Sequence, residues 1–451
     1  MHGWMNPMRL FDRPLQPLRL GTPPTRHPQP GLALRAAAVL LCLVATLATG
    51  AEPAAPTAPL PTLAIPTHGA YTGVYADFGD SEEEVTLAKI EAFTALVGKH
   101  QALIAFSNHW GTGRFPAAEV RLIDGYGAAP LIYWNPWQAR NDMACPRFTI
   151  EQIPTGEWDA YIDTWARDAR AFGKPILVAW GLEMNGKWFP WSGVFHGGGT
   201  PVPDAEPTRY QGPEAFKRAY RHVVDRVRAA GASNISWVFH ANNTPDPAEP
   251  WNTMAAYYPG SAYVDWLGVS SYGKQFPGED WTSVTTAFRA PHAELAALDP
   301  HKPILLAEWG IAEFPKQGDK GEWIEDAFSQ MEHKLPRLKG AIFWHEKWTN
   351  AADQSTSDCR VNSSPDALDA YREGVARPFW LAAPQDSTPP PPAKPCSWNG
   401  YLHAWRMPCP LPVRRQAQIA IGSGIGILTA AEPILRLVSI AAAGECELKP
   451  P

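Results

Sequence analysis

ILVAWGLEMNGKWFPW, residues 176–191, is the most informative stretch of the chain. Its first four residues form a continuous apolar run, which is typical of a parallel strand covered on both faces. Glu183 follows where burial should end, and Asn185 and Gly186 supply turn residues. Trp188 and Trp191 then make the segment too aromatic for an ordinary solvated loop. Taken alone, Glu183 is best interpreted as a structural cap of the strand end, although aromatic surroundings also suit a general acid.

Short apolar runs of the same kind recur along the chain. The predicted strands are residues 71–75, 102–106, 130–133, 176–180, 235–239, 266–270, 304–307 and 341–344. Helical candidates lie between them at residues 82–97, 158–172, 213–230, 282–298 and 321–335. This alternation predicts an α/β fold, a (β/α)8 TIM barrel. A doubly wound sheet is the alternative, but no glycine-rich phosphate turn follows the first strand.

Polar and aromatic side chains gather at the carboxyl ends of the predicted strands, where a parallel barrel places its chemistry. A barrel with a purely structural role would have little reason to collect them on one face. These residues include Asp77, His109, Trp134, Glu183, His240, Asn242, Tyr272, Glu308 and Trp344.

KPILLAEWG, residues 302–310, resembles the first stretch. In both, an apolar run is followed by a glutamate, and in this stretch Glu308 is followed by an aromatic residue and Gly. Glu183 and Glu308 would therefore both point into the same end of the barrel. Two carboxyl groups about 5 Å apart are what a retaining glycosidase needs, one as nucleophile and the other first as acid and then as base. The sequence supplies the two side chains but not their separation.

The composition argues against a nucleic-acid partner. The chain has 451 residues, and 39 Lys and Arg against 45 Asp and Glu give a net charge of −6. No basic cluster alternates with aromatic residues as in strand-binding grooves. The 20 Trp residues often follow apolar runs. Aromatic faces at such positions suit stacking on sugar rings, although a protein of this size can also simply bury them.

The N-terminus has the pattern of an export signal. Arg35 precedes an apolar run at residues 36–45, and small residues follow at 48–51. The run is shorter than the roughly 20 residues of a membrane span. Residues 1–51 are therefore predicted to be a signal peptide or an uncleaved anchor, with no other stable membrane span. The protein is expected to be secreted or periplasmic.

Proline-rich segments flank the predicted barrel. Residues 52–67 are interpreted as an Ala/Pro linker, 68–380 as the catalytic barrel, and 381–451 as a Pro-rich linker and a tail to which no fold can be assigned. Cys145 and Cys359 in the barrel could pair in an exported protein, but the sequence does not decide this. No cysteine pair has zinc-site spacing, and His109, His240 and His345 lie on different strands. A monomer without metal or cofactor is expected.

The segment LEMNGKWFPW, residues 182–191, resembles the acid/base signature of glycoside hydrolase family 26, whose best-known members are endo-β-1,4-mannanases. AEWG, residues 307–310, is similar to the nucleophile strand of that family. The resemblance extends from His68 to about Trp380. It implies a (β/α)8 barrel that hydrolyses a β-linked polysaccharide with retention, with Glu183 as the acid/base and Glu308 as the nucleophile.

The resemblance also implies roles for other residues at the strand ends. Tyr272 would orient the nucleophile, and Trp344 would be a platform for a sugar ring. Trp188 would line the cleft, and Trp134 is a weaker match on the third strand. His109, His240 and Asn242 are expected to hydrogen-bond the substrate.

Two features leave alternatives open. Leu182 stands where the family usually has His, so xylan, β-glucan and a bacterial exopolysaccharide remain alternatives to mannan. A carbohydrate-binding barrel without catalysis is the alternative from another class. Glu346 is interpreted as the partner of Lys347 in a structural salt bridge rather than as a third catalytic carboxylate.

Overall fold

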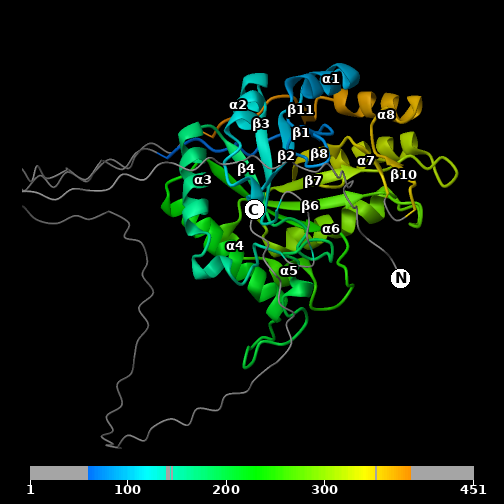
Figure 1. The fold of residues 1–451 in the computed structure, drawn as a ribbon. Helices are drawn as coiled ribbons and strands as arrows, with labels where there is room; N and C mark the ends of the chain where they lie inside the picture. The colour runs from blue at the N-terminus through cyan, green and yellow to red at the C-terminus, as the bar shows by residue number, and fades with distance from the viewer. Residues whose placement is uncertain (1–58, 139–142, 144–145, 351–352, 388–451) are drawn as a thin grey trace, which may run out of the picture. The chain divides into compact units, whose positions relative to one another are not determined.

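The computed structural model describes residues 59–138, 143, 146–350 and 353–387. These residues form a closed parallel barrel that is surrounded by helices (Figure 1). The predicted signal or anchor, residues 52–58 of the predicted linker and nearly all of the predicted tail lie outside the described residues, as does Cys145.

Eight parallel strands form the barrel, as predicted, and β8 pairs with β1 to close it. The observed strands extend the predicted ones, mostly at the carboxyl ends, because polar residues there continue the backbone pairing. The strands are β1 (Ala70–Tyr75), β2 (Leu103–His109), β3 (Ala129–Asn135), β4 (Ile176–Trp180), β5 (Ile235–Asn242), β6 (Trp266–Tyr272), β7 (Ile304–Gly310) and β8 (Leu338–Trp344). We call the carboxyl ends of these strands the barrel mouth.

Helices cover the outside of the barrel (Figure 1). They are α1 (Leu87–Val97), α2 (Ala117–Tyr126), α3 (Asp159–Phe172), α4 (Gln211–Ala229), α5 (Met254–Tyr257), α6 (Val284–Leu298), α7 (Lys320–His333) and α8 (Pro365–Ala376). Short 3-10 helices are η1 (Trp110–Thr112), η2 (Ile153–Thr155), η3 (Gly193–Phe195) and η4 (Ser261–Tyr263). Beyond β8 lie the hairpin strands β9 (Lys347–Thr349) and β10 (Thr356–Asp358), and β11 (Trp380–Leu381) pairs with β1.

The helices bury the apolar stripe that their sequences predict. In α4, Phe216, Tyr220, Val223 and Val227 are fully buried, as expected for a helix with one face on the barrel. One predicted boundary is wrong, since the helix expected over residues 82–97 begins only at Leu87.

Thr86 explains the late start of α1. Its side chain accepts a hydrogen bond from the backbone N–H of Lys89, so it caps the helix at this point. The preceding residues take another path, in which the Glu82 carbonyl accepts from the Ser107 N–H on β2. Because Glu82 lies outside the helix, its side chain lies at the barrel mouth.

The ordered barrel includes residues on both sides of the range 68–380. Leu63 is only 3% exposed, and it forms a β-bridge with Asp386. The Tyr71 hydroxyl donates to the Ala64 carbonyl at 3.0 Å and accepts from the Gln385 N–H at 3.2 Å. The two ends of the described chain therefore meet beside β1.

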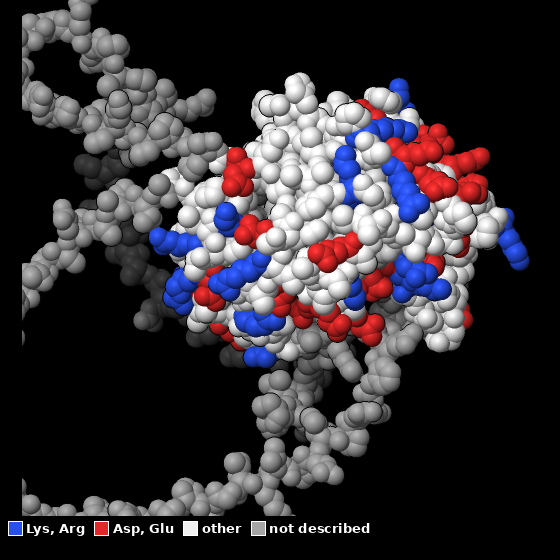
Figure 2. Space-filling model, turned by 90° about the horizontal axis from the view of Figure 1, so that it is seen from above, with Lys and Arg blue, Asp and Glu red and all other residues white. Residues whose placement is uncertain are grey.

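No helix within the described ranges is both long enough and apolar enough to cross a membrane. Figure 2 shows a face of the molecule on which acidic and basic side chains are interspersed, without a continuous basic surface among the described residues.

Candidate active site

Glu308 reaches the barrel mouth beside an irregularity in β7. The register between β6 and β7 shifts after Leu306, so that Ser270 lies opposite Glu308 and Ala307 is left over as a bulge. Bulges redirect neighbouring side chains and are common beside active sites. The Ala307 carbonyl accepts a 2.7 Å hydrogen bond from the Tyr133 hydroxyl on β3. The bulge thus places Glu308 opposite Ser270. The hydrogen bond from Tyr133 on β3 holds the bulge in place.

Glu183 follows β4 in a strained backbone conformation. Its φ is +52°, in the left-handed region that costs a non-glycine residue about 1–3 kcal/mol. Its N–H donates to the His240 carbonyl at 2.7 Å. The Asn185 side chain donates to the Asn242 carbonyl and accepts from the Asn242 N–H, each at 2.8 Å. These bonds fasten the turn after β4 to β5 and hold Glu183 at the mouth.

The carboxyl groups of Glu183 and Glu308 influence each other. Burial raises the pKa of both, and repulsion by Glu183 raises that of Glu308 further. The Tyr272 hydroxyl donates to Glu308 Oε2 at 2.8 Å, and the Trp188 indole N–H donates to Glu183 Oε2 at 2.7 Å. Ser270 lies opposite Glu308 in the strand pairing, and its hydroxyl lowers the pKa of both carboxyl groups as a hydrogen-bond donor. Two carboxyl groups that repel each other lose their protons in two separate steps.

Trp344 contributes an aromatic ring to the mouth at the end of β8. It stacks on Tyr75 with 3.9 Å between ring centres, and it is 8% exposed. Its indole N–H donates to Glu346 Oε2 at 2.8 Å. An aromatic surface with a carboxyl group beside it suits a sugar ring, which presents both an apolar face and hydroxyl groups.

Glu346 does not form the salt bridge that the sequence suggested. Lys347 lies 3.8 Å from Asp358 instead, so the interpretation of Glu346 as the partner of Lys347 is wrong. Burial raises the pKa of Glu346 to about 8, and the charge of Glu82 adds to this rise. Glu346 is therefore a partly buried residue at the mouth and is not part of a surface ion pair.

Glu82 is a further carboxyl group that sequence reasoning placed elsewhere, inside a helix. It has a φ of +58° and accepts a 2.5 Å hydrogen bond from the Ser107 hydroxyl. Burial raises its pKa to about 7, the bond from Ser107 opposes this, and repulsion by Glu183 adds to it. Thr86, which caps α1, was the available sequence signal that Glu82 lies outside the helix.

Trp134, His109 and His240 lie beneath the surface of the mouth. They are 0%, 1% and 1% exposed. Trp134 stacks on Trp165 with 4.0 Å between ring centres, and its indole donates to Tyr161 at 3.0 Å. A ring buried in this way cannot touch a sugar unless its neighbours move, so substrate contacts of these three residues stay predictions. Their buried position suits a structural role, in which they pack beneath the residues that are exposed at the mouth.

Asn242 and Trp188 are partly exposed. The Asn242 side chain donates to the Thr244 carbonyl at 2.8 Å, which leaves its amide oxygen available as an acceptor. Trp188 presents its ring beside Glu183. Both positions are compatible with the predicted contacts to substrate.

The histidines at the mouth are neutral and do not form a metal site with acidic or cysteine side chains in the part of the chain that the structure describes. Burial lowers the pKa of His109 to about 4 and that of His345 to about 3. The His345 Nδ1 accepts from the Val361 N–H at 3.1 Å. Cys359 is a buried free thiol, while its possible partner Cys145 lies outside the described residues.

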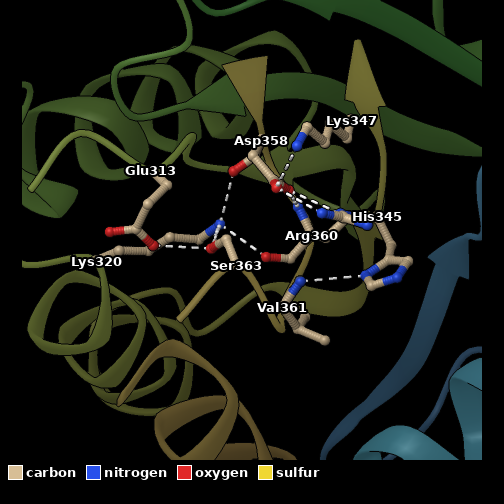
Figure 3. Close-up of polar contacts among 8 residues, drawn as sticks. All are labelled: Glu313, Lys320, His345, Lys347, Asp358, Arg360, Val361 and Ser363. Carbon is tan, nitrogen blue, oxygen red and sulfur yellow. Dashed lines mark hydrogen bonds and ion pairs between the residues drawn. The ribbon is translucent and has the colours of Figure 1, made fainter. Parts of the chain in front are cut away.

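A buried lysine fixes the loop that carries Glu346 (Figure 3). Lys320 at the start of α7 donates to the carbonyls of Asp358 and Arg360 at 3.0 and 2.8 Å, and to the Ser363 hydroxyl at 2.8 Å. The Cys359 N–H donates to the Glu346 carbonyl at 2.9 Å. The loop after β8 is therefore anchored to α7 from within.

The fold is thus a (β/α)8 barrel that has a carboxyl group after the end of β4 and another at the end of β7. Residues 156–312, which include both Glu183 and Glu308, match the family described as Glycosyl hydrolase family 26. The stretch of the chain that carries both glutamates is therefore similar to this family.

Relatives of the chain carry different names. It is 30% identical to Endoglucanase H of Acetivibrio thermocellus over 312 residues, which are 66% of this chain and 31% of the relative. It is 25% identical to Beta-1,3-xylanase TXYA of a Vibrio species, over 51% of this chain and 50% of the relative. It is 28% identical to a Mannan endo-1,4-beta-mannosidase of Bacillus subtilis, over 40% and 42% respectively. The chain thus spans a half or less of the length of each of these relatives.

Proposed function

We propose that this protein is a retaining glycoside hydrolase that cleaves a β-linked polysaccharide. The observation that carries the proposal is that Glu183 and Glu308 follow or end β4 and β7 at the barrel mouth, where the charge of Glu183 raises the pKa of Glu308. A separation of about 5 Å between two such carboxyl groups is typical of retaining enzymes, and one of roughly 6.5–9.5 Å is typical of inverting enzymes.

Double displacement requires that one carboxyl group of the pair is protonated and the other is ionised. In the first step the Glu308 carboxylate attacks the anomeric carbon while Glu183 donates its proton to the leaving oxygen, so the glycosidic bond breaks and a glycosyl ester of Glu308 forms. In the second step Glu183 takes a proton from water, the water oxygen attacks the same carbon, and the ester breaks. Tyr272 holds Glu308 in position through its 2.8 Å hydrogen bond.

Mannan is the first candidate substrate, because LEMNGKWFPW resembles the mannanase signature and a named mannosidase is among the relatives. β-Glucan is the second candidate, because the match to Endoglucanase H covers more of the chain. A monomer in the periplasm or outside the cell fits a polymeric substrate and the predicted signal.

The test is release of reducing sugar from mannan, xylan and mixed-linkage β-glucan. Wild-type protein should cleave at least one of them, and Glu308→Ala and Glu183→Ala should each lose activity by roughly 1,000-fold or more. Glu373→Ala, which changes an exposed glutamate on α8, should keep full activity. NMR of the first product should show the β-anomer. Binding of a polymer without turnover would favour the non-catalytic barrel, and an initial α-anomer would exclude retention.

A further inference from the structure

We propose that Ser270, oriented by His240, is a positioning residue that donates its hydroxyl proton to Glu308 before the first step and to Glu183 after it. The inference rests on the proposed function, since it assigns Ser270 a role in both halves of the double displacement. It adds a residue that neither the motif nor the family match supplies.

The strand register places Ser270 at this position. It is fully buried, and the bulge at Ala307 puts it directly opposite Glu308 in the pairing of β6 with β7. Its neighbour Ser271 faces the other side of the strand, where its hydroxyl donates to the Ala287 carbonyl on α6 at 3.0 Å. Only the first of these adjacent serines therefore faces the carboxyl pair.

His240 fixes how the Ser270 hydroxyl is oriented. Its Nε2 lies 2.8 Å from Ser270 Oγ, and its Nδ1 is buried without a hydrogen-bond partner among the described residues. Burial lowers the pKa of His240 to about 3, so the ring is neutral and carries one N–H. Nδ1 is unpaired in either tautomer, but a buried N–H without an acceptor is the rarer of the two arrangements. The proton therefore belongs on Nε2 and is donated to Ser270.

The serine hydroxyl has one proton of its own, so it can donate to only one carboxyl group at a time. Before the first step the ionised Glu308 is the stronger acceptor, because bonds to a charged oxygen are the strong ones. Once Glu308 is esterified and Glu183 has lost its proton, the stronger acceptor is Glu183. A rotation of one hydroxyl thus stabilises whichever carboxylate the next step uses. The other ionisable groups that face this pair are Glu82, Tyr133 and Tyr272.

The test compares Ser270→Ala with Ser271→Ala, which removes the same hydroxyl from the adjacent residue of the same strand. Loss of a hydrogen bond to a carboxylate raises its pKa. We therefore expect the acidic limb of kcat/KM for Ser270→Ala to move up by about one pH unit, and hydrolysis of the glycosyl ester to slow by about 10-fold. Ser271→Ala should keep the wild-type profile. Ser270→Thr, which retains a hydroxyl, should restore most of it.

Carboxyl titration gives a second readout that does not need a substrate. In protein labelled with 13C at the glutamate carboxyls, with signals assigned through Glu183→Gln and Glu308→Gln, the first ionisation of the pair should shift to higher pH in Ser270→Ala only. His240→Phe should shift it in the same direction by less. If no polymer is cleaved but the titration shifts, the proposed hydrolase function fails, while the inference that Ser270 donates to the carboxyl pair is supported. If polymer is cleaved but Ser270→Ala titrates like Ser271→Ala, the inference on Ser270 is overturned.

Discussion

At the scale of single residues, Trp188 tunes the proposed acid/base. Its indole N–H donates to Glu183 at 2.7 Å and favours the ionised carboxylate. Trp188→Phe should therefore raise the pKa of Glu183 and keep it protonated to higher pH, which moves the basic limb of the activity profile up by about one pH unit. The control is Trp191→Phe, because Trp191 donates to the Leu182 carbonyl and not to a carboxylate. An unmoved basic limb in Trp188→Phe would contradict this role.

Glu346 should make the fold less stable as the pH rises. Its folded pKa of about 8 lies above the unfolded value, so the folded state binds more protons between about pH 4.5 and pH 8, and stability falls through that window. Glu346→Gln keeps an acceptor for the Trp344 indole and removes the charge. It should raise the free energy of unfolding by roughly 1–3 kcal/mol at pH 8 and little at pH 4.5. Urea unfolding at both pH values measures this.

The exposed Glu373 provides the comparison for that experiment. Glu373→Gln should leave the difference in stability between the two pH values at its wild-type size. If Glu346→Gln behaves in the same way, Glu346 is not held as a buried, protonated carboxyl group.

The sequence could predict the two proposed catalytic glutamates but not the residues that tune them. Glu183 and Glu308 each end a conspicuous apolar run, and a parallel barrel brings such ends together. Ser270 lies within a strand and looks like any small polar residue there. Its relation to Glu308 depends on the bulge at Ala307, and no pattern of apolar residues specifies a bulge.

At the scale of elements, periodicity predicted the strands because each is buried along most of its length. It failed at the start of α1, where the acidic residues before Thr86 look like a helix and instead pair with β2. Helices α2 and α8 were not among the named candidates. In α2, only Val120 and Ile123 are fully buried, so its apolar stripe is short.

The loop after β8 depends on Lys320, whose ammonium group binds two carbonyls and a hydroxyl inside the protein. Lys320→Met keeps the apolar stem of the side chain and leaves the two carbonyls without this donor. The free energy of unfolding should fall by about 2–4 kcal/mol, because unsatisfied buried polar groups cost about 1–3 kcal/mol each. Amide exchange should also speed up at Cys359, whose N–H bonds the Glu346 carbonyl. The exposed Lys316→Met should change neither quantity.

At the scale of the whole molecule, the barrel is completed by segments outside the range 68–380. Leu63 is buried, Ala64 accepts from the Tyr71 hydroxyl, and the Ala64 N–H donates to the Gln385 carbonyl at 2.7 Å. These contacts cover the edge of β1 beside β11, and they join chain segments more than 300 residues apart. We therefore expect the stability of the barrel to depend on the segments at both ends of the described range.

Two trimmed chains test this dependence. A chain of residues 59–387 keeps Leu63 and the bonds between the two ends, whereas a chain of residues 68–380 loses them. Burial of one leucine contributes about 1.5–3 kcal/mol and each hydrogen bond about 0.5–1.5 kcal/mol, so the shorter chain should be less stable by roughly 2–5 kcal/mol. Urea unfolding of both, followed by tryptophan fluorescence, measures the difference. Within a chain of 59–387, Leu63→Ala should reproduce about half of it, while Ile65→Ala, which changes an exposed side chain, should reproduce almost none. Equal stability of the two trimmed chains would mean that the segments beside β1 contact the barrel but do not stabilise it.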